Sequence, residues 1–436
     1  MTIEDIKNKI PQSVKNGYHL VNAMLANFWF GFPSRKLKVI GVTGTNGKTT
    51  TVQMIGRILE EAGYKVAISS TINFKLGKKQ WANKTKLTTL SAWSVQNFIS
   101  DAVNAGCEYL VLEVSSHSLD QNRVRDIEFD VAVITNVTRE HLDYHETMEK
   151  YRAAKMKLFR MFKDGSGVAI VNLGMEKPHE FLQIAKKAEK NVYSLEEIKE
   201  NDNKDLKAVY AEGILLGQKK SSFSVRGTYF TIGLVGEFNV ENALAAISVG
   251  LSQGIDLEIM ALGLGKMKKV PGRMDYVENE RGIDIVIDYA LTPDSMEKLG
   301  QVFEKQKANS EGGKLIWVFG SCGQRDRGKR PIMGKIVAKF ADIAIVTNED
   351  PYNEDPQRII DEVFVGVLDG GAVENENAFR IFNRKEAIKK ALESAQIGDV
   401  VLVTGKGAEE TMAVGQQRLP WSDREVIKNL LSVPKK

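Results

Sequence analysis

Apolar runs and amphipathic segments alternate along most of this chain. Apolar runs rich in β-branched residues predict strands, and the amphipathic segments between them predict helices. The first series of predicted strands lies at 39–43, 66–69, 109–114, 131–136 and 168–172, with helices at about 49–62 and 91–105. Because apolar strands alternate with helices, we expect a parallel sheet covered by helices on both faces.

The pattern changes twice further along the chain. Residues 200–235 alternate apolar and polar positions between glycine turns, which predicts a small antiparallel addition. Proline and glycine in 268–273 (KKVPGR) break a helical pattern. A second series follows, with strands at 283–288, 315–319, 343–347 and 399–405 and helices starting at Pro293, Pro331 and Pro356. This second series predicts a separate doubly wound domain.

Composition and charge exclude several classes of protein. The 436 residues include 60 basic and 56 acidic side chains, and a net charge of +4 gives no basic surplus for general nucleic-acid binding. Cys107 and Cys322 have the spacing of neither a zinc site nor a disulfide framework, which indicates a reducing, cytoplasmic location. No run reaches the roughly 18 apolar residues of a membrane helix, and the start lacks the order of a signal peptide. The apolar stretch Leu20–Phe32 predicts a helix buried against the next domain, with a membrane-surface role as the alternative.

The segment 41–50 (GVTGTNGKTT) lies between a predicted strand and a predicted helix. Backbone N–H groups of such a loop, together with the helix N-terminus, form a cradle for phosphate oxygens. We expect Lys48 to reach the β- and γ-phosphates and the Thr49 hydroxyl to hold Mg²⁺. Val42 stands where the strict phosphate-loop pattern has glycine, so the loop is a variant. The alternative is a plain glycine turn at the start of a helix.

Further candidates follow later strands. Glu113 ends a predicted strand and suits Mg²⁺, and the hydroxyls, amide and arginine of 114–123 (VSSHSLDQNR) can hold an anionic, oxygen-rich substrate. Zinc is disfavoured at His141 and His145, because Leu142 stands where a zinc protease motif has glutamate. We interpret His141 as a magnesium ligand or a neighbour of the phosphates, and His145 as a surface or capping residue. Spacing alone favours an exposed helix position for Lys155.

These motifs, in this order, resemble those of the Mur ligases, the ATP-dependent amide-forming enzymes of peptidoglycan precursor synthesis. The closest type is UDP-N-acetylmuramoyl-tripeptide synthetase. The resemblance runs from about Pro33 to the C-terminus and is carried by PSRKLKVIGVTGTNGKTTT, EVSSHSLDQNRV, ITNVTREHLDYH, YRAAKMKLF, GEFNVENALAA, VPGRMD, DYALTPDS, FGSCGQRDRGKRPIM and GKGAEE. Folylpolyglutamate synthases share only the phosphate loop and a few other motifs.

The resemblance implies a fold and a set of site residues. The fold is α/β: a central P-loop ATPase domain with a parallel sheet at 37–270 and a C-terminal Rossmann-like doubly wound, amino-acid-binding domain at 271–436. Lys48, Lys155 and His141 are the implied catalytic residues, and Thr49, Glu113, His141 and a carbamylated Lys155 the implied ligands of two Mg²⁺ ions. ATP binding is implied for Gly44, Thr45, Asn46, Gly47, Lys48, Thr49, Thr50, Asn239, Asn242, Arg273 and Asp288. Muramyl-peptide binding is implied for Thr88, Thr89, Ser115, Gln121 and Arg123, and amino-acid binding for Arg330, Glu349, Asp350, Gly405 and Glu409.

Three features depart from the family pattern. The N-terminal domain of about a hundred residues that binds the uridine end is missing, so we expect residues 1–36 to form a short helical remnant. Leu291 replaces a histidine near the nucleotide. Residues 349–352 read EDPY where the diaminopimelate-adding enzymes have DNPR, which removes a bidentate carboxylate clamp. The remaining acidic pair favours an amine-bearing side chain such as lysine or ornithine.

The expected function is therefore an ADP-forming ligase that adds an amino acid, lysine or a similar diamino acid rather than diaminopimelate, to a muramyl-dipeptide precursor through an acyl phosphate. Its expected partners are that precursor and a free amino acid, without nucleic acid or stable membrane insertion, and we expect a monomer. Two alternatives stay open. One is a P-loop ATPase or nucleotide-binding protein without ligase activity, and the other is a ligase that acts on another carboxylate acceptor such as a polyglutamate.

Overall fold

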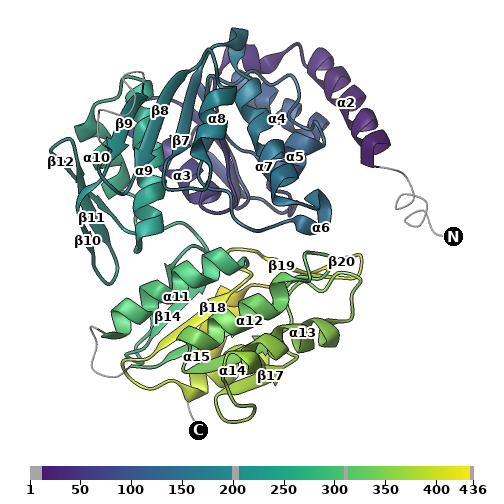
Figure 1. Cartoon of the computed structure of the whole chain (residues 1–436), viewed down its shortest axis with the longest axis vertical. Coiled ribbons are helices and arrows are strands. Elements are labelled where there is room, and N and C mark those ends of the chain that lie inside the picture. Colours follow the sequence, from purple (N-terminus) through teal and green to yellow (C-terminus); the bar gives the residue numbers. More distant parts are fainter. Residues whose placement is uncertain (1–11, 199–205, 309–312, 433–436) are drawn as a thin grey trace. The chain divides into compact units, whose positions relative to one another are not determined.

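The computed structural model describes residues 12–198, 206–308 and 313–432 (Figure 1). Contacts divide the chain into two units. The first runs up to Val137 and includes Thr147–Gly233 and Glu237–Lys268. The second contains Thr138–Glu146, Leu234–Gly236 and the chain from Lys269 onward. The short segment Thr138–Glu146 thus groups mainly with the chain from Lys269 onward, which follows it by more than a hundred positions.

The first unit is built on one twisted sheet in the order β4-β3-β2-β5-β1-β6-β7-β8-β9. The pairs from β2 through β9 are parallel, whereas β3 pairs antiparallel with β2 and β4. The predicted strands of the first series are confirmed. Their bounds are β1 Lys38–Thr43, β2 Val66–Ser69, β3 Asn73–Leu76, β4 Lys79–Ala82, β5 Tyr109–Glu113, β6 Val131–Ile134, β7 Val168–Asn172, β8 Glu189–Ser194 and β9 Leu206–Tyr210.

Helices cover this sheet and fill its core. Val39 of β1 and Leu110 of β5 join one buried cluster with Val95 of α4 and Phe181 of α8, while α3 packs against α9 and α10. The bounds are α2 Gln12–Trp29, α3 Lys48–Glu61, α4 Ala92–Asn104, α5 Ser116–Asp120, α7 Met148–Met156, α8 Pro178–Ile184, α9 Glu237–Ser252 and α10 Leu257–Gly265.

The antiparallel addition predicted for 200–235 is confirmed in part. Strands β10 Glu212–Leu216, β11 Ser221–Val225 and β12 Thr228–Ile232 form a separate antiparallel sheet. In contrast, β9 pairs in parallel with β8 at the edge of the main sheet. Residues 199–205 of the predicted range lie outside the described residues.

The second unit has the predicted doubly wound form, with a sheet in the order β13-β14-β18-β15-β16-β17 that is parallel except for β13. One helix begins at Lys329, two residues before the predicted Pro331, which lies in its first turn, where no backbone donor is needed. The strands are β13 Asp275–Tyr276, β14 Asp284–Asp288, β15 Leu315–Phe319, β16 Ile343–Thr347, β17 Ala378–Ile381, β18 Val400–Thr404 and a hairpin of β19 Thr411–Val414 and β20 Gln417–Pro420. The helices are α6 Leu142–His145, α11 Pro293–Ala308, α12 Lys329–Phe340, α13 Pro356–Asp369, α14 Arg384–Ser394 and α15 Asp423–Ser432.

Helix α2 corrects the expectation for Leu20–Phe32. One face of the helix is buried through Ala23, Ala26 and Asn27, but Phe28 and Trp29 on the other face are exposed. The expected burial therefore holds for one face alone. No helix within the described residues is long and apolar enough to cross a membrane.

Candidate functional site

The glycine loop between β1 and α3 has a backbone that other residues would strain. Gly44 and Gly47 have φ angles of 152° and 83°. A Cβ atom on Gly44 would lie 1.8 Å from Oγ1 of Thr135, and one on Gly47 would lie 2.2 Å from Oδ1 of Asn242. Both glycines are thus required by neighbouring side chains as well as by the turn.

Residues after β6 hold this loop in place, and sequence reasoning did not single them out. The backbone carbonyl of Asn136 accepts from the Thr45 N–H, and its side-chain oxygen accepts from the Asn46 N–H, both at 2.9 Å. The Thr135 hydroxyl donates to the Asn46 carbonyl at 2.6 Å. Their position after β6 could have identified Thr135 and Asn136, because ligands of parallel sheets bind at the carboxyl ends of the strands.

Glu113, at the end of β5, is a buried carboxylate surrounded by hydroxyl donors. The Thr49 hydroxyl lies 3.1 Å from both carboxylate oxygens. The Thr71 N–H donates to Oε2 at 2.8 Å and the Thr71 hydroxyl to Oε1 at 2.9 Å. Thr71 was not predicted. The structure therefore brings together two of the predicted metal ligands, Thr49 and Glu113, directly behind the loop.

Lys155 is buried on α7, with 1% of its surface exposed, so the exposed position expected from spacing is wrong. Its Nζ donates to the Gly44 carbonyl at 2.6 Å and lies 4.3 Å from the centre of the Tyr151 ring. The Tyr151 hydroxyl in turn lies 3.1 Å from Oγ1 of Thr45. Lys48 folds back onto the same loop, where Nζ donates to the Thr45 carbonyl at 2.8 Å.

The residues expected to bind the muramyl peptide form a chain of contacts beside Glu113. The Thr89 hydroxyl donates to the Glu113 carbonyl at 2.9 Å and accepts from the Ser115 N–H at 3.0 Å. Arg123 donates to the Thr89 carbonyl at 2.7 Å, and Oγ1 of Thr88 accepts from Thr71 at 3.2 Å. Gln121 ends α5, with its backbone N–H bonded to His117.

Asn239 and Asn242 are buried on α9 and hydrogen-bonded to one another at 3.3 Å. Oδ1 of Asn242 also accepts from the Thr51 hydroxyl in the first turn of α3. Thr50, which was expected to bind ATP, lies in the same turn and is buried as well. The asparagine pair therefore supports the phosphate loop from the side of α9.

His141 lies in the segment Thr138–Glu146, which belongs to the second unit. It precedes α6 with a left-handed backbone, φ 56° and ψ 31°, and its Nδ1 lies 3.9 Å from Oε1 of Glu140. His145, expected to be a surface or capping residue, is buried at the last position of α6, so the surface alternative is wrong. Within residues 12–198, 206–308 and 313–432 no group of three or more His, Cys, Asp or Glu side chains has the arrangement of a metal centre.

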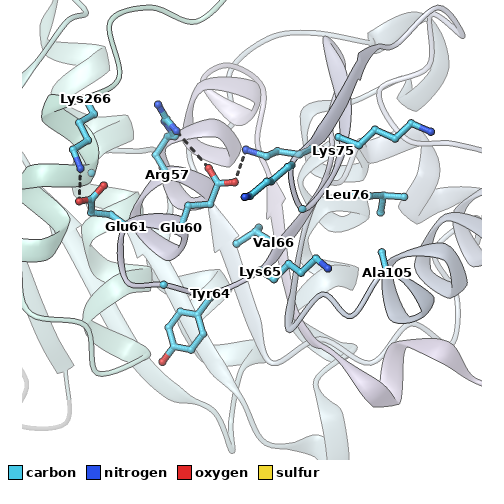
Figure 2. Close-up of a pocket in the computed structure, with 15 residues that line it drawn as sticks. Arg57, Glu60, Glu61, Tyr64, Lys65, Val66, Lys75, Leu76, Ala105 and Lys266 are labelled. Atoms are coloured by element: carbon cyan, nitrogen blue, oxygen red, sulfur yellow. Dashed lines mark hydrogen bonds and ion pairs between the residues drawn. The ribbon is translucent and has the colours of Figure 1, made fainter.

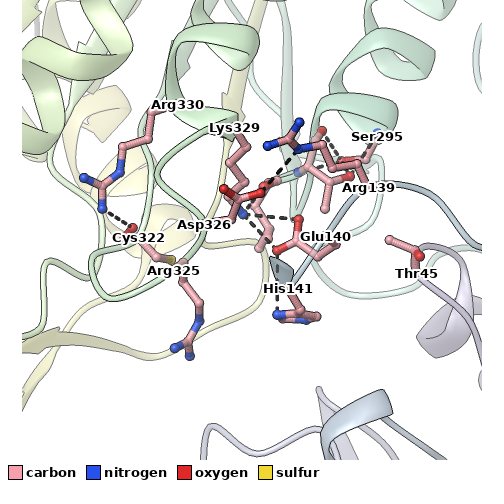
Figure 3. Close-up of polar contacts among 12 residues, drawn as sticks. Thr45, Arg139, Glu140, His141, Ser295, Cys322, Arg325, Asp326, Lys329 and Arg330 are labelled. Carbon is pink, nitrogen blue, oxygen red and sulfur yellow. Dashed lines mark hydrogen bonds and ion pairs between the residues drawn. The ribbon is translucent and has the colours of Figure 1, made fainter. Parts of the chain in front are cut away.

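Figure 3 shows how this segment is held by α12. The buried Lys329 ammonium donates to Glu140 at 3.0 and 3.3 Å and to the Leu291 carbonyl at 2.9 Å. Arg139 reaches Asp326 at 3.4 Å. Leu291 was predicted as a departure from the family pattern, whereas Lys329 and Glu140 were not predicted from the sequence. The ion pair between Lys329 and Glu140 therefore joins the segment that contains His141 to the helix that contains Arg330.

Asp288 and Arg273, both expected near the nucleotide, lie close together in the second unit. The Asp288 carboxylate accepts the N–H groups of Met274 and Ala290, each at 2.7 Å. Burial raises the pKa of Asp288, and the nearby Arg273 guanidinium partly opposes this. Arg273 also stacks over the Tyr289 ring at 4.3 Å.

Glu349 is the most distinctive of the predicted amino-acid-binding residues. Its Oε1 accepts from the Cys322 thiol at 3.1 Å, whereas its buried Oε2 accepts no hydrogen bond from the described residues. Gly405, with φ 105°, passes so close that a Cβ there would lie 2.0 Å from Oε2. Burial raises the pKa of Glu349, with Arg384 and the Cys322 hydrogen bond opposing the rise.

The charges of Asp350 and Glu409 are compensated within the fold. Nζ of the buried Lys406 lies 2.9 Å from Asp350 and 2.5 Å from Glu409. Asp350 also accepts the Ala413 N–H at 2.6 Å. Burial opposes the charge on Lys406, yet the two carboxylates raise its pKa overall. The acidic pair at 349–350 therefore carries less uncompensated charge than its sequence suggests.

Arg330 is fully buried on α12, and its guanidinium is already engaged. It contacts Glu362 at 2.7 Å, Glu354 at 2.9 Å and the Cys322 carbonyl at 3.2 Å. These contacts link α12 to α13 and to the loop after β15. Its expected role in recognising an amino acid stays a prediction, and its position indicates a supporting role.

A cavity of about 1010 Å³ lies at the other end of α3, away from the glycine loop (Figure 2). Its lining includes Arg57, Lys65 and Lys75, and Glu60 forms ion pairs with Arg57 and Lys75. None of the predicted site residues lines this cavity.

Most of the chain is similar to proteins of one family. A model of the Mur ligase middle domain matches residues 42–250, and a model of the Mur ligase glutamate ligase domain matches residues 272–407. A diaminopimelate ligase of Syntrophomonas wolfei that acts on UDP-N-acetylmuramoyl-L-alanyl-D-glutamate is 39% identical over 94% of this chain and 81% of its own length. A UDP-N-acetylmuramyl-tripeptide synthetase of Roseiflexus is 37% identical with the same coverage.

Solved structures give the same picture of the fold. A structure of a diaminopimelate ligase of the same type is 31% identical, with a TM-score of 0.59 over 91% of this chain and 78% of that one. The folylpolyglutamate synthase of Mycobacterium tuberculosis is 15% identical but reaches a TM-score of 0.72 over 96% of both chains. At that identity the second likeness concerns the fold alone.

Proposed function

Because the chain belongs to the Mur ligase family, we propose that it joins an amino acid to a muramyl-dipeptide carboxylate through an acyl phosphate. The chain is an ATP- and Mg²⁺-dependent, ADP-forming amide ligase of peptidoglycan synthesis. The observation that carries the proposal is the cluster behind the glycine loop, where Thr49 and Glu113 meet and Lys155 reaches Gly44.

In the first step of the proposed reaction, a substrate carboxylate oxygen attacks the γ-phosphorus of ATP, the bond to the β-phosphate oxygen breaks, and ADP leaves. Two anions must approach one another, so charge neutralisation is the main catalytic requirement. Lys48 and the loop N–H groups supply positive charge, and Lys48 must leave the Thr45 carbonyl to do so. Thr49 and Glu113 would hold Mg²⁺, which neutralises phosphate charge when bound.

In the second step, the amine of the amino acid attacks the acyl carbon, and phosphate leaves with the bonding electrons as the amine loses a proton. The buried Oε2 of Glu349 suits a cationic amine, since it accepts no hydrogen bond from the described residues. We assign muramyl-peptide binding to Thr88, Thr89, Ser115, Gln121 and Arg123, beside Glu113.

We further propose that Lys155 is carbamylated. The neutral amine attacks CO₂, a nitrogen–carbon bond forms, and one amine proton is released, which leaves an anionic carbamate. The support is the position of Lys155, which is 1% exposed and hydrogen-bonded to Gly44 of the phosphate loop. An anionic carbamate there would supply oxygen ligands of the kind that Mg²⁺ prefers, which a buried ammonium cannot. The carbamate oxygens would add to the magnesium ligands of the first unit, and the role of His141 as a magnesium ligand stays a prediction.

The identity of the added amino acid rests on two opposed observations. Tyr352 replaces the clamp arginine, which favours lysine. Lys406 compensates Asp350 and Glu409, and the guanidinium carbons of Arg325 and Arg418 lie 5.4 and 5.5 Å from the Tyr352 ring centre. Since these arginines suit a distal carboxylate, we propose a diamino acid of the diaminopimelate class, as the names of the relatives also suggest.

The test is an assay of ADP release and product mass with ATP, Mg²⁺ and each pair of acceptor and amino acid. The acceptors are muramyl-dipeptide with and without UDP, and the amino acids are lysine, ornithine and diaminopimelate. We expect ADP release to require both partners and the product to gain the mass of one diaminopimelate less water. Equal ADP release without the amino acid would identify an ATPase instead, and selective use of lysine would overturn the distal-carboxylate proposal.

A further inference from the structure

The outward face of α2 is a continuous apolar surface. Tyr18, Val21, Met24, Leu25, Phe28 and Trp29 are between 54% and 76% exposed. Single exposed apolar residues are ordinary, but a contiguous patch of this size marks an interaction surface.

The spacing of these residues indicates what kind of partner fits. Val14, Tyr18, Val21, Leu25 and Phe28 follow one another at intervals of four, three, four and three residues. This is the heptad seam of helices that pack side by side. Lys15 is the only Asp, Glu, Lys or Arg residue in the sequence of α2, so little charge opposes the approach of an equivalent helix.

The helix is held firmly by its opposite face. Ala23 and Ala26 are buried, Asn27 donates to the Asp126 carbonyl at 3.2 Å, and Asn16 donates to Asp120 at 3.1 Å. A partner therefore meets a helix already ordered on the sheet domain, which lowers the entropy that association must overcome.

The exposed area matches that of a stable dimer. Side chains of this size that are more than half exposed offer on the order of 100 Å² each, so the seam with Met24 and Trp29 provides about 700 Å². A standard interface buries about 800 Å² on each partner.

Side-chain size changes along the seam. Val14 and Gly17 make one end small, whereas Phe28 and Trp29 make the other end large, with Trp93 of α4 stacked 6.5 Å from Trp29. An antiparallel pair would set each large end against a small end, and a parallel pair would set large against large. We propose that a second copy of this chain covers the face, as an antiparallel two-fold pair of α2 helices crossing at Val21.

The proposed dimer differs from the monomer expected from the sequence, and sedimentation of the full chain across micromolar concentrations distinguishes the two. We expect a reversible dimer whose dissociation constant rises on the order of 100-fold in Val21→Glu, because two carboxylates would meet at the crossing point. Ile397→Glu, at an 85% exposed position in the second unit, is the matched control and should leave the dimer unchanged. Sedimentation as a monomer at every concentration would overturn the proposal, as would monomers that bind lipid vesicles.

Cysteine cross-linking tests the orientation independently. With diamide as oxidant, two Val21→Cys thiols should lose their hydrogens and form a disulfide across the two-fold axis. In Val14→Cys the equivalent thiols would lie about 21 Å apart, too far to join. Equal cross-linking of both variants would contradict the antiparallel arrangement. The unsubstituted chain, whose Cys107 is buried and Cys322 half-buried, supplies the background.

Discussion

Nζ of Lys155 donates a 2.6 Å hydrogen bond to the carbonyl oxygen of Gly44, a residue 111 positions earlier in the chain. This bond fixes α7 to Gly44 of the phosphate loop. The same lysine is the one whose carbamylation we propose, so its chemical state and the shape of the loop are coupled.

Replacing Lys155 by Ala should abolish ligation. The reason is the loss of both the loop contact and the proposed carbamate. Short-chain carboxylates such as acetate should restore part of the rate, because they can occupy the space of the carbamate. The measurement is amino-acid-dependent ADP release with and without added carboxylate.

The matched comparison for that experiment is Lys157→Ala, since Lys157 is partly exposed and pairs with Asp120 at 2.8 Å rather than with the loop. It should keep most of its activity and gain nothing from acetate. Full activity in Lys155→Ala, or equal acetate effects in both variants, would remove the carbamate proposal.

Gly47→Ala should weaken ATP binding at least tenfold. The new Cβ would lie 2.2 Å from Oδ1 of Asn242. In addition, alanine would have to adopt the left-handed backbone conformation of Gly47, which by itself costs roughly 1 kcal/mol. Gly63→Ala is the control, because Gly63 has φ 91° but no atom within 4 Å of the added Cβ. Calorimetric titration of ATP checks this, and equal affinities in the two variants would show that the close approach to Asn242 is unimportant.

Lys329→Met should destabilise the second unit by roughly 3–5 kcal/mol, because it leaves the buried Glu140 carboxylate without its partner. The double variant with Glu140→Gln should recover most of that loss. Lys339→Met, which breaks an exposed pair with Glu297, should change stability by less than about 1 kcal/mol. Hydrogen exchange of the α12 amides measures the stability of the second unit in all three variants. A double variant as unstable as the single one would refute the coupling.

Glu349 should make the stability of the second unit depend on pH. Burial raises its pKa above the ordinary 4.5, so the folded chain binds more protons than the unfolded chain between the two values. The free energy of unfolding therefore falls as pH rises through that window. Glu349→Gln should flatten this slope, whereas Glu393→Gln, at a 61% exposed position, should not. Exchange rates in β16, corrected for intrinsic rates, provide the measurement.

The order of strands and helices was predictable because hydrophobic periodicity reflects burial on the faces of a sheet. The positions of the glycine loop and of Glu113 were predictable for a similar reason, since the loop follows β1 and Glu113 ends β5. Their binding of phosphate and Mg²⁺ stays a prediction. Asn136 and Thr71 were missed, because their contribution depends on which strand ends meet in space.

Hydrophobic periodicity could not predict which charged side chains are buried. Spacing favoured an exposed position for Lys155 and gave no sign of burial for Lys329 or Arg330, yet each is buried with partners distant in sequence. Helix α2 shows the converse, because an apolar stretch predicts burial even when one of its faces stays exposed. A sequence pattern indicates whether a residue favours a buried or an exposed position, but contacts with residues distant in sequence decide which position it takes.

Transfer of an oxygen atom tests the central claim most directly. A muramyl-dipeptide whose reacting carboxylate carries oxygen-18 is turned over with ATP and the amino acid, and the released phosphate is analysed by mass spectrometry. Formation of an acyl phosphate predicts one heavy oxygen in each phosphate released, because the carboxylate oxygen that attacked phosphorus leaves with it. Unlabelled phosphate accompanied by ADP would mean that water, and not the substrate carboxylate, attacks ATP in this protein.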